Sequence, residues 1–202
     1  MKFAHTLIAA AALALSMGAN AAVTGSQGGG FGSFLSLSSA GLNGGAVATL
    51  SGGAVYNADQ PFADIPKGGV FGGNFLALGP TAGQPATLAF SGGGVDYVSF
   101  LWGSPDTYNM LTVNSTGGGS QLFTTSILGL PGDGNQSVSQ YVQFAGIDGS
   151  KITSLTFNNV PAIDAFETAN YSITPVPEPE TYALLLGGLG AVAFVARRRK
   201  AN

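Results

Sequence analysis

The side chains that most often carry out catalysis are scarce between Ala22 and Val176. This stretch holds no histidine, no cysteine and no arginine, and its eight carboxylates are Asp59, Asp64, Asp96, Asp106, Asp133, Asp148, Asp164 and Glu167. A Ser-His-Asp or Cys-His arrangement is therefore excluded, and so is a zinc site built on imidazole or thiolate ligands. The sequence predicts no catalytic residue, no cofactor and no enzymatic activity.

A pair of carboxylates is the one remaining arrangement that could hydrolyse a glycosidic bond. Asp96 and Asp106 flank the segment around Trp102, and a hairpin there would let them face each other. Each also stands where aspartate favours a turn, Asp96 after the triple glycine 92–94 and Asp106 in the sequence 103–106, Gly-Ser-Pro-Asp. We expect turn residues here, with a carboxylate-only hydrolase as a minor alternative.

Calcium is the one metal whose usual ligands are abundant, because it binds carboxylate, amide and carbonyl oxygens. The candidate ligands are Asp133 with Asn135 in one loop, and Asp59 with Asp64 in another. Neither loop matches a known calcium-binding pattern such as the EF-hand. We expect turn residues in both loops and keep calcium as the alternative.

Aromatic side chains offer flat apolar faces that can stack on sugar rings. Tyr108, beside the turn, is the candidate for an exposed ring, and Asp106 and Asn109 are candidates for hydrogen bonds to sugar hydroxyls. Trp102 alternates with Val98 and Phe100 at the period of a strand, which favours a place in the core. These three residues, Tyr108, Asp106 and Asn109, form the predicted sugar contact.

The charge balance excludes several partners. Between Ala22 and Val176 two lysines, Lys67 and Lys151, stand against the eight carboxylates, and two minus eight gives a net charge of −6. Nucleic-acid binding needs clustered lysine and arginine, so nucleic acid is not a partner. A surface rich in glycine, serine, threonine, asparagine and glutamine in place of charge is suited to a hydrated polysaccharide.

Short runs of β-branched and aromatic residues recur along this stretch, separated by glycine and proline. Period-two alternation of this kind is typical of half-buried strands. We expect strands at 34–38, 46–50, 73–78, 86–90, 97–102, 110–114, 120–127, 137–145, 152–158 and 166–174, and no amphipathic helix. The pattern predicts one all-β domain over residues 22–175, an antiparallel β-sandwich of jelly-roll or lectin-like type.

The first 21 residues have the organisation of a secretory signal peptide. Lys2 is followed by an apolar run from Leu7 to Leu15 that is too short to span a membrane, and then by Ala19-Asn20-Ala21. Small residues at Ala19 and Ala21 suit signal peptidase, so we expect cleavage after Ala21 and export of the chain through the inner membrane.

Residues 176–202 combine three features in a fixed order. Pro177-Glu178-Pro179 is followed by an apolar run, about 182–196, and then by Arg197-Arg198-Arg199-Lys200. We expect the run to form a single transmembrane helix, slightly shorter than a full span, with the basic cluster held in the cytoplasm. An ordinary tail anchor that is never cut is the alternative.

This order of triplet, helix and basic tail resembles the PEP-CTERM sorting signal. The resemblance implies that exosortase, an integral membrane cysteine protease, recognises Pro177, Glu178 and Pro179 and removes the helix and tail, while Arg197–Lys200 retain the chain until then. The segment 98–113 also resembles a strand-turn-strand segment of surface domains in this family, which look like lectin-type sandwiches.

The family context implies a location at the cell surface or in the extracellular matrix, in an exopolysaccharide layer of a biofilm. The predicted function is a non-enzymatic surface or matrix protein, anchored transiently in the inner membrane and then cleaved by exosortase. A specific carbohydrate-binding module is the second hypothesis. An uncleaved membrane-anchored domain is the third.

Overall fold

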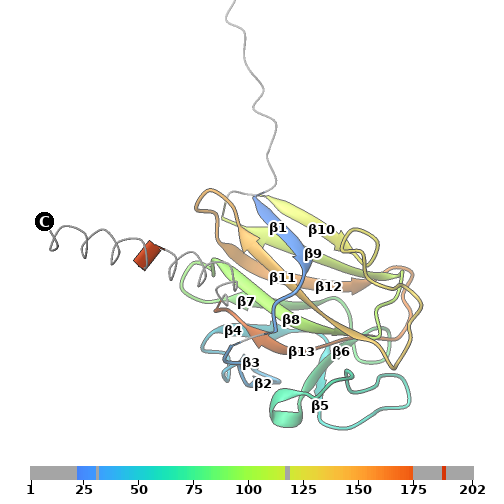
Figure 1. Cartoon of the computed structure of the whole chain (residues 1–202). Coiled ribbons are helices and arrows are strands. Elements are labelled where there is room, and N and C mark those ends of the chain that lie inside the picture. Colours follow the sequence, from blue (N-terminus) through green and yellow to red (C-terminus); the bar gives the residue numbers. More distant parts are fainter. Residues whose placement is uncertain (1–21, 31, 117–118, 175–187, 190–202) are drawn as a thin grey trace, which may run out of the picture.

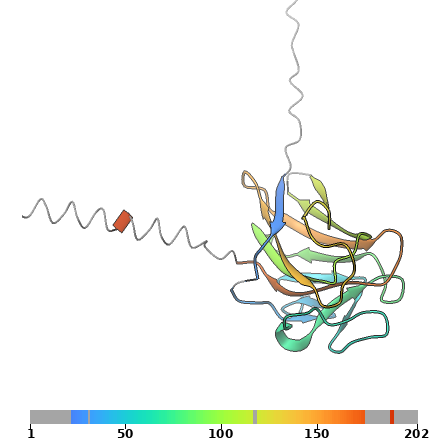
Figure 2. The same ribbon diagram turned by 45° about the vertical axis from the view of Figure 1, so that its right-hand side comes forward.

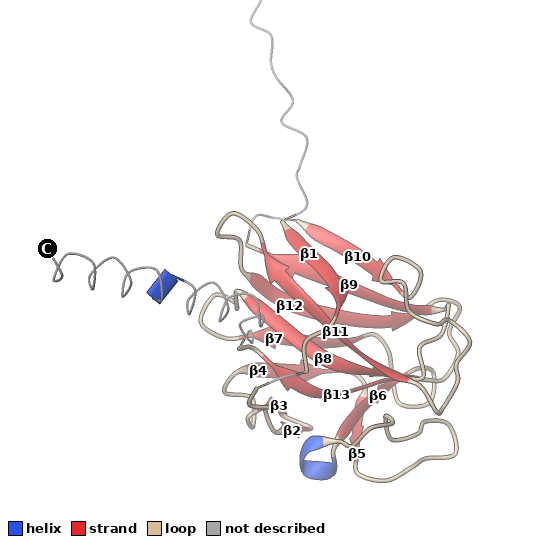
Figure 3. Cartoon of the chain, viewed as in Figure 1, coloured by secondary structure: helices blue, strands red, loops and turns tan. Residues whose placement is uncertain are grey.

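The structure, a computed structural model, describes residues 22–30, 32–116, 119–174 and 188–189. Its described residues up to Thr174 are all-β, with one short 3₁₀ helix, η1 (Phe71–Gly73) (Figures 1 and 3). The strands are β1 (Val23–Gln27), β2 (Leu37–Ser38), β3 (Gly41–Leu42), β4 (Ala48–Ser51), β5 (Ala54–Tyr56), β6 (Phe75–Leu78), β7 (Ala86–Phe90), β8 (Tyr97–Gly103), β9 (Asn109–Ser115), β10 (Ser120–Thr124), β11 (Ser139–Gly146), β12 (Ile152–Asn159) and β13 (Phe166–Ser172).

The strands form two antiparallel sheets, which confirms the all-β prediction. The order of the six-stranded sheet, called sheet A here, is β1-β11-β8-β13-β6-β5, and that of the seven-stranded sheet B is β10-β9-β12-β7-β4-β3-β2. Figure 2 shows β1, in blue, at the edge of sheet A, where it pairs with β11. The predicted signal peptide and the predicted helix at 182–196 lie outside the described residues, apart from 188–189.

The main hydrophobic core lies between the two sheets. Phe100 on β8 and Phe157 on β12 meet edge to face, with ring centroids 5.5 Å apart, so the inner faces of sheets A and B are in contact. Trp102 is fully buried and stacks on Phe166 with centroids 4.3 Å apart. The predicted place of Trp102 in the core is confirmed, because successive side chains of a strand point to opposite faces and those of Val98, Phe100 and Trp102 share the inner one.

The outer face of sheet A carries a second, smaller core. Phe75, Ala77 and Ala169 point away from the main core and are covered by apolar residues of the segment 57–74, among them Phe62 and Ala63. This surface of sheet A is called the covered face below. The long connection between β5 and β6 therefore acts as a cover over the sheet.

The predicted strands are confirmed over most of their lengths, and β7 matches at both ends. The predicted strand 34–38 is wrong in its first half, since only Leu37–Ser38 belongs to a strand. Backbone donors in that half bond elsewhere, as when Leu35 N donates to Tyr171 O at 2.7 Å. The strands β1, β3 and β5 were not among the predicted strands. In β3 and β5, two or three residues leave no measurable period.

Candidate functional site

The turn after β8 carries two of the three residues predicted to contact sugar. Asp106 is partly exposed, and its backbone forms an isolated bridge with Asp133. Tyr108 is half-buried, and its hydroxyl donates to the backbone oxygen of Asp164 at 3.1 Å. Burial, followed by the nearby Asp106 carboxylate, raises the pKa of Tyr108 above its ordinary value. Tyr108 therefore stays neutral and presents only part of its ring to solvent.

The prediction that Asn109 contacts sugar is corrected by its place in the structure. It is fully buried, its Oδ1 accepts from Trp102 Nε1 at 3.2 Å and from Asp106 N at 2.8 Å, and its Nδ2 donates to Asn159 Oδ1 at 3.1 Å. A buried amide with both ends paired is a structural group, since exposing it would leave its partners unsatisfied. The alternation Asn109, Leu111, Val113 points inward and is the sequence signal for this position.

The predicted calcium loop at Asp133 and Asn135 forms two consecutive side-chain turns. Asp133 Oδ1 accepts from Asn135 N at 3.3 Å, and Asn135 Oδ1 accepts from Ser137 N at 2.9 Å. Such bonds to the backbone two residues on are the usual turn role of aspartate and asparagine. Within the described ranges no three carboxylates or histidines gather closely enough to hold a metal ion. Calcium binding here remains an untested prediction.

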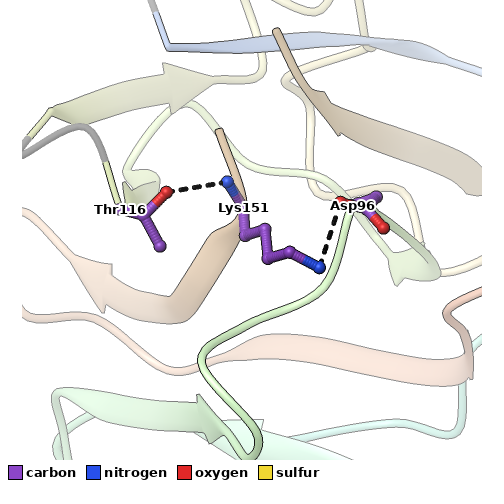
Figure 4. Close-up of polar contacts among 3 residues, drawn as sticks. All are labelled: Asp96, Thr116 and Lys151. Atoms are coloured by element: carbon purple, nitrogen blue, oxygen red, sulfur yellow. Dashed lines mark hydrogen bonds and ion pairs between the residues drawn. The ribbon is translucent and has the colours of Figure 1, made fainter. Parts of the chain in front are cut away.

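The two carboxylates considered for hydrolysis, Asp96 and Asp106, lie beyond opposite ends of β8. The seven residues of that strand separate them by about 20 Å or more at roughly 3.3 Å per residue. Paired glycosidase carboxylates stand about 5–10 Å apart, so this separation does not fit the minor alternative in which a hairpin brings the two carboxylates face to face. Asp96 Oδ1 instead lies 3.5 Å from Lys151 Nζ on the surface, as Figure 4 shows.

Glu167 on β13 is the one buried carboxylate among the described residues. It is only 2 % exposed, it lies on the covered face, and its Oε2 accepts from Ser104 Oγ at 2.9 Å. Burial is the main cause that raises the pKa of its carboxyl to about 8, and the hydrogen bond from Ser104 works in the opposite direction. At neutral pH Glu167 is therefore mostly protonated. No sequence pattern indicated this burial, because Phe166–Thr168 shows no polar-apolar alternation.

The outer face of sheet B carries uncharged polar side chains at ten of thirteen positions and is called the hydroxyl face here. Alternation along five adjacent strands brings these residues to one surface, since their neighbours Leu88, Val113 and Leu155 point into the core. The residues of this face are Thr49, Ser51, Thr87, Ala89, Met110, Thr112, Asn114, Ser120, Leu122, Thr124, Ser154, Thr156 and Asn158. None of the thirteen is charged.

Outward side chains on neighbouring strands form rows across this face, and hydrogen bonds join members of the same row. Thr87 Oγ1 and Thr156 Oγ1 lie 3.1 Å apart, and Asn114 Nδ2 donates to Ser154 Oγ at 2.8 Å. Asn114 Oδ1 also accepts from Ser120 Oγ at 2.5 Å. Neighbouring strands lie about 4.8 Å apart, so donors and acceptors recur at about that spacing along each row, except at Ala89, Met110 and Leu122. Such an array can exchange neutral hydrogen bonds with a polymer of hydroxyl groups.

Sequence reasoning did not single out the hydroxyl face, although the signal was present. Alternating serine, threonine and asparagine in 110–114 and 154–158 mark one face of each strand as polar. The missing information was strand order: only the register shows that these strands are neighbours.

The residues predicted for sorting lie outside the described part of the chain. These are Ala19 and Ala21 at the predicted cleavage site, the triplet Pro177-Glu178-Pro179, and the basic cluster 197–200. Within the part that the structure describes, no helix is long and apolar enough to cross a membrane.

Comparison with known proteins adds one match. The family model described as the PEP-CTERM protein-sorting motif matches residues 175–200. No curated protein matches the chain, and no solved structure does. The match covers the same triplet, apolar run and basic tail that the sequence showed. The chain is therefore a PEP-CTERM domain-containing protein, and the motif marks it as an exported protein directed to exosortase.

Proposed function

We propose that the protein is a non-enzymatic component of the cell surface or extracellular matrix that associates with neutral exopolysaccharide, as in a biofilm. The observation that carries the proposal is the hydroxyl face, thirteen outward positions on sheet B without a charge. Neutral hydroxyl and amide groups match the repeating hydroxyls of a polysaccharide. The net charge of −6 between Ala22 and Val176 disfavours polyanions.

The proposed fold type is a jelly-roll sandwich. Strands β6 to β13 supply the order β6-β13-β8-β11 in sheet A and β10-β9-β12-β7 in sheet B. Eight strands distributed in this alternating way correspond to two interlocked Greek keys, an arrangement that lectin domains share. This likeness supports a binding role without naming a ligand.

The proposed route runs through the inner membrane. A signal peptide ending at Ala21 leaves β1, which begins at Val23, free to complete the edge of sheet A. The apolar run 182–196 then anchors the folded domain by one helix until exosortase cuts near Pro177. Intact mass of the exported protein, from cells with and without exosortase, tests this route. A species that begins at Ala22 and ends near Pro177 only with the protease supports it, and one that keeps Arg199 in both strains identifies a plain anchor.

Binding through the hydroxyl face is tested by placing charges on it. Thr112 and Thr156 are opposite one another on β9 and β12. We expect Thr112→Glu with Thr156→Glu to abolish co-sedimentation of the exported protein with neutral exopolysaccharide purified from the producing cells. The matched control is Ser126→Glu with Ser137→Glu, two exposed positions off the face. Equal retention of both double variants contradicts the proposal.

A specific carbohydrate-binding module is the second candidate, favoured by Tyr108 and Asp106 at the turn after β8. Next to them the loop before β13 exposes Val160 and Ile163, 49 % and 45 % exposed, and Val160 N donates to Tyr108 O at 2.9 Å. A glycan array separates the two candidates. Binding to one defined glycan that Tyr108→Ala removes supports the module, whereas a silent array together with retention in bulk polysaccharide favours the matrix role.

A further inference from the structure

An exposed aromatic patch lies at the end of the domain from which the chain continues toward residue 182. Phe71 in η1 is 50 % exposed, the only aromatic side chain among the large exposed hydrophobic residues of the described part. Its ring centroid lies 6.0 Å from that of Phe34, and Phe34 stacks on Tyr141 at 6.2 Å with an angle of 4° between the ring planes. Phe34, Phe71 and Tyr141 are called the aromatic patch below.

A buried side chain holds this patch in place. Asn170 on β13 is 5 % exposed and has a φ of 54°, next to a shift in the register between β13 and β8. Its Oδ1 accepts from Phe71 N at 2.6 Å, and its Nδ2 donates to Tyr141 Oη at 2.7 Å and to Gly69 O at 2.9 Å. A β-bulge often re-aims a side chain in this manner. The exposure of Phe71 is thus fixed by the fold and does not come from a loose loop.

The patch is close to the point where the chain leaves the domain. Asn170 stands two residues before Ser172, the last residue of β13, and Leu35 N donates to Tyr171 O. Seven residues lie between Thr174 and Tyr182, where the apolar run begins, so eight Cα-to-Cα steps join them. A chain of eight residues spans at most about 29 Å. Any membrane that holds the run from Tyr182 onward therefore lies within reach of Phe71.

The charge around the patch also suits a lipid surface. The two segments that carry Phe34 and Phe71, residues 28–36 and 65–74, contain a single charged residue, Lys67, which is a cation. The rest of the domain is acidic. Aromatic side chains partition to the interface of a bilayer, where an apolar ring meets lipid and a polar edge meets water. A tether adds an effective concentration in the millimolar range, so a weak contact is enough to orient the domain.

The geometry points to a membrane-docking role for the aromatic patch: it seats the tethered domain on the lipid surface, with the hydroxyl face left free, until the tail is removed. This inference rests on the transient anchor in the proposed function. The partner is the headgroup region of the bilayer itself, and the docking ends when cleavage near Pro177 removes the tether.

The full chain is well suited to a test because it contains no cysteine. Single-cysteine variants carry a fluorophore at one of three positions: Ser33 beside the patch, Ser126 in the turn after β10, and Ala191 in the apolar run. Ser33 and Ser126 are both exposed. Each labelled chain is reconstituted into phosphatidylcholine vesicles that contain lipids with nitroxide quenchers near the headgroup and along the acyl chain, since position 191 is expected near the middle of the bilayer. We expect strong quenching at positions 33 and 191 and little at 126.

A second substitution separates the patch from the tether. Phe71→Ser should reduce quenching at position 33 to the level at 126 and leave position 191 unchanged. The matched control Leu122→Ser, which removes another exposed apolar residue (46 % exposed) from the hydroxyl face, should change neither signal. Quenching at 191 without quenching at 33, or quenching at 33 that Phe71→Ser does not alter, overturns the docking inference alone. An unquenched label at 191 overturns the anchor, and the docking inference with it.

Discussion

The outer faces of the two sheets have the same strand geometry and opposite surfaces. On sheet A the segment 57–74 covers the sheet and buries Phe75, Ala77 and Ala169 in a second core. On sheet B most of the corresponding positions carry serine, threonine or asparagine, and Thr112 and Thr156 are neighbours there, each partly exposed. A sheet face in water is either covered or polar, and this protein uses one solution on each side.

The difference shows which side is free to bind. The covered face contributes to stability, because its apolar residues are removed from water. The hydroxyl face contributes little to stability, because its side chains exchange hydrogen bonds with one another or with water at small net gain. A surface whose residues are not needed for folding is the one that can be specialised for a partner.

The largest expected effect is the loss of the second core. Phe75 is fully buried under the cover, with its ring centroid 6.1 Å from that of Tyr56. We expect Phe75→Ala to lower the free energy of unfolding by about 3–5 kcal/mol, the range for large-to-alanine changes in a core. Thr156→Ala on the hydroxyl face should cost less than about 1 kcal/mol. Urea unfolding of the exported protein measures both, and similar losses would erase the contrast between the two faces.

The next effect concerns pH and the buried carboxyl of Glu167. Its pKa is raised from 4.5 to about 8, chiefly by burial under the cover. Between these two values the unfolded chain releases the proton that the folded chain keeps. The stabilising contribution is therefore complete below pH 4.5 and is lost as pH rises toward 8, by about 1.4 kcal/mol for each pH unit.

Glu167→Gln isolates this carboxyl, because glutamine is neutral at every pH and its side-chain oxygen can still accept from Ser104 Oγ. We expect the variant to lose most of the decline in unfolding free energy between pH 5 and pH 8, and to be the more stable protein at pH 8. Asp64, also near Glu167, stays in both proteins. Unfolding measured at intervals across this range checks the slope. Parallel curves for the two proteins would mean that Glu167 is ionised in the folded state.

The period-two alternation of the sequence predicted much of the fold and little of the candidate site. Alternation placed Trp102 in the core, and it placed both ends of β7 correctly, because period two is a property of neighbouring residues. The same pattern could have placed Asn109 in the core as well, but the nearby turn suggested an exposed position. The bonds of Asn109 run to residues seven and fifty positions away, and such pairings follow only from the packing of strands β8, β9 and β12.

The sorting motif could be predicted from the sequence, whereas the two surfaces of the domain could not. The triplet Pro177-Glu178-Pro179 with its apolar run and basic tail is contiguous, so the sequence alone predicted it and the family model matches it. The hydroxyl face joins residues from Thr49 to Asn158, and the aromatic patch joins Phe34 to Tyr141. A surface assembled from distant strands has no contiguous sequence pattern, and only strand order brings it into view.

The smallest expected effect compares two asparagines, one on each sheet. Asn170 holds the loop of the covered side through Phe71 N, Gly69 O and Tyr141 Oη. Among the described residues, the side chain of Asn114 bonds to Ser154 and Ser120, both on the hydroxyl face. Glycine tolerates the φ of 54° at position 170, so Asn170→Gly removes the hydrogen bonds without adding backbone strain.

We expect Asn170→Gly to cost about 1–3 kcal/mol of unfolding free energy and to open the segment 65–74 to limited proteolysis, since its buried partners lose their hydrogen bonds. Asn114→Ala should cost less than about 1 kcal/mol, because water replaces its partners, and should leave the proteolysis pattern as it was. Urea unfolding together with mapping of the first cleavage sites distinguishes the two. If Asn170→Gly left segment 65–74 as resistant as before, the cover would be held by its apolar contacts alone, and the aromatic patch would lose its fixed position as an argument for docking.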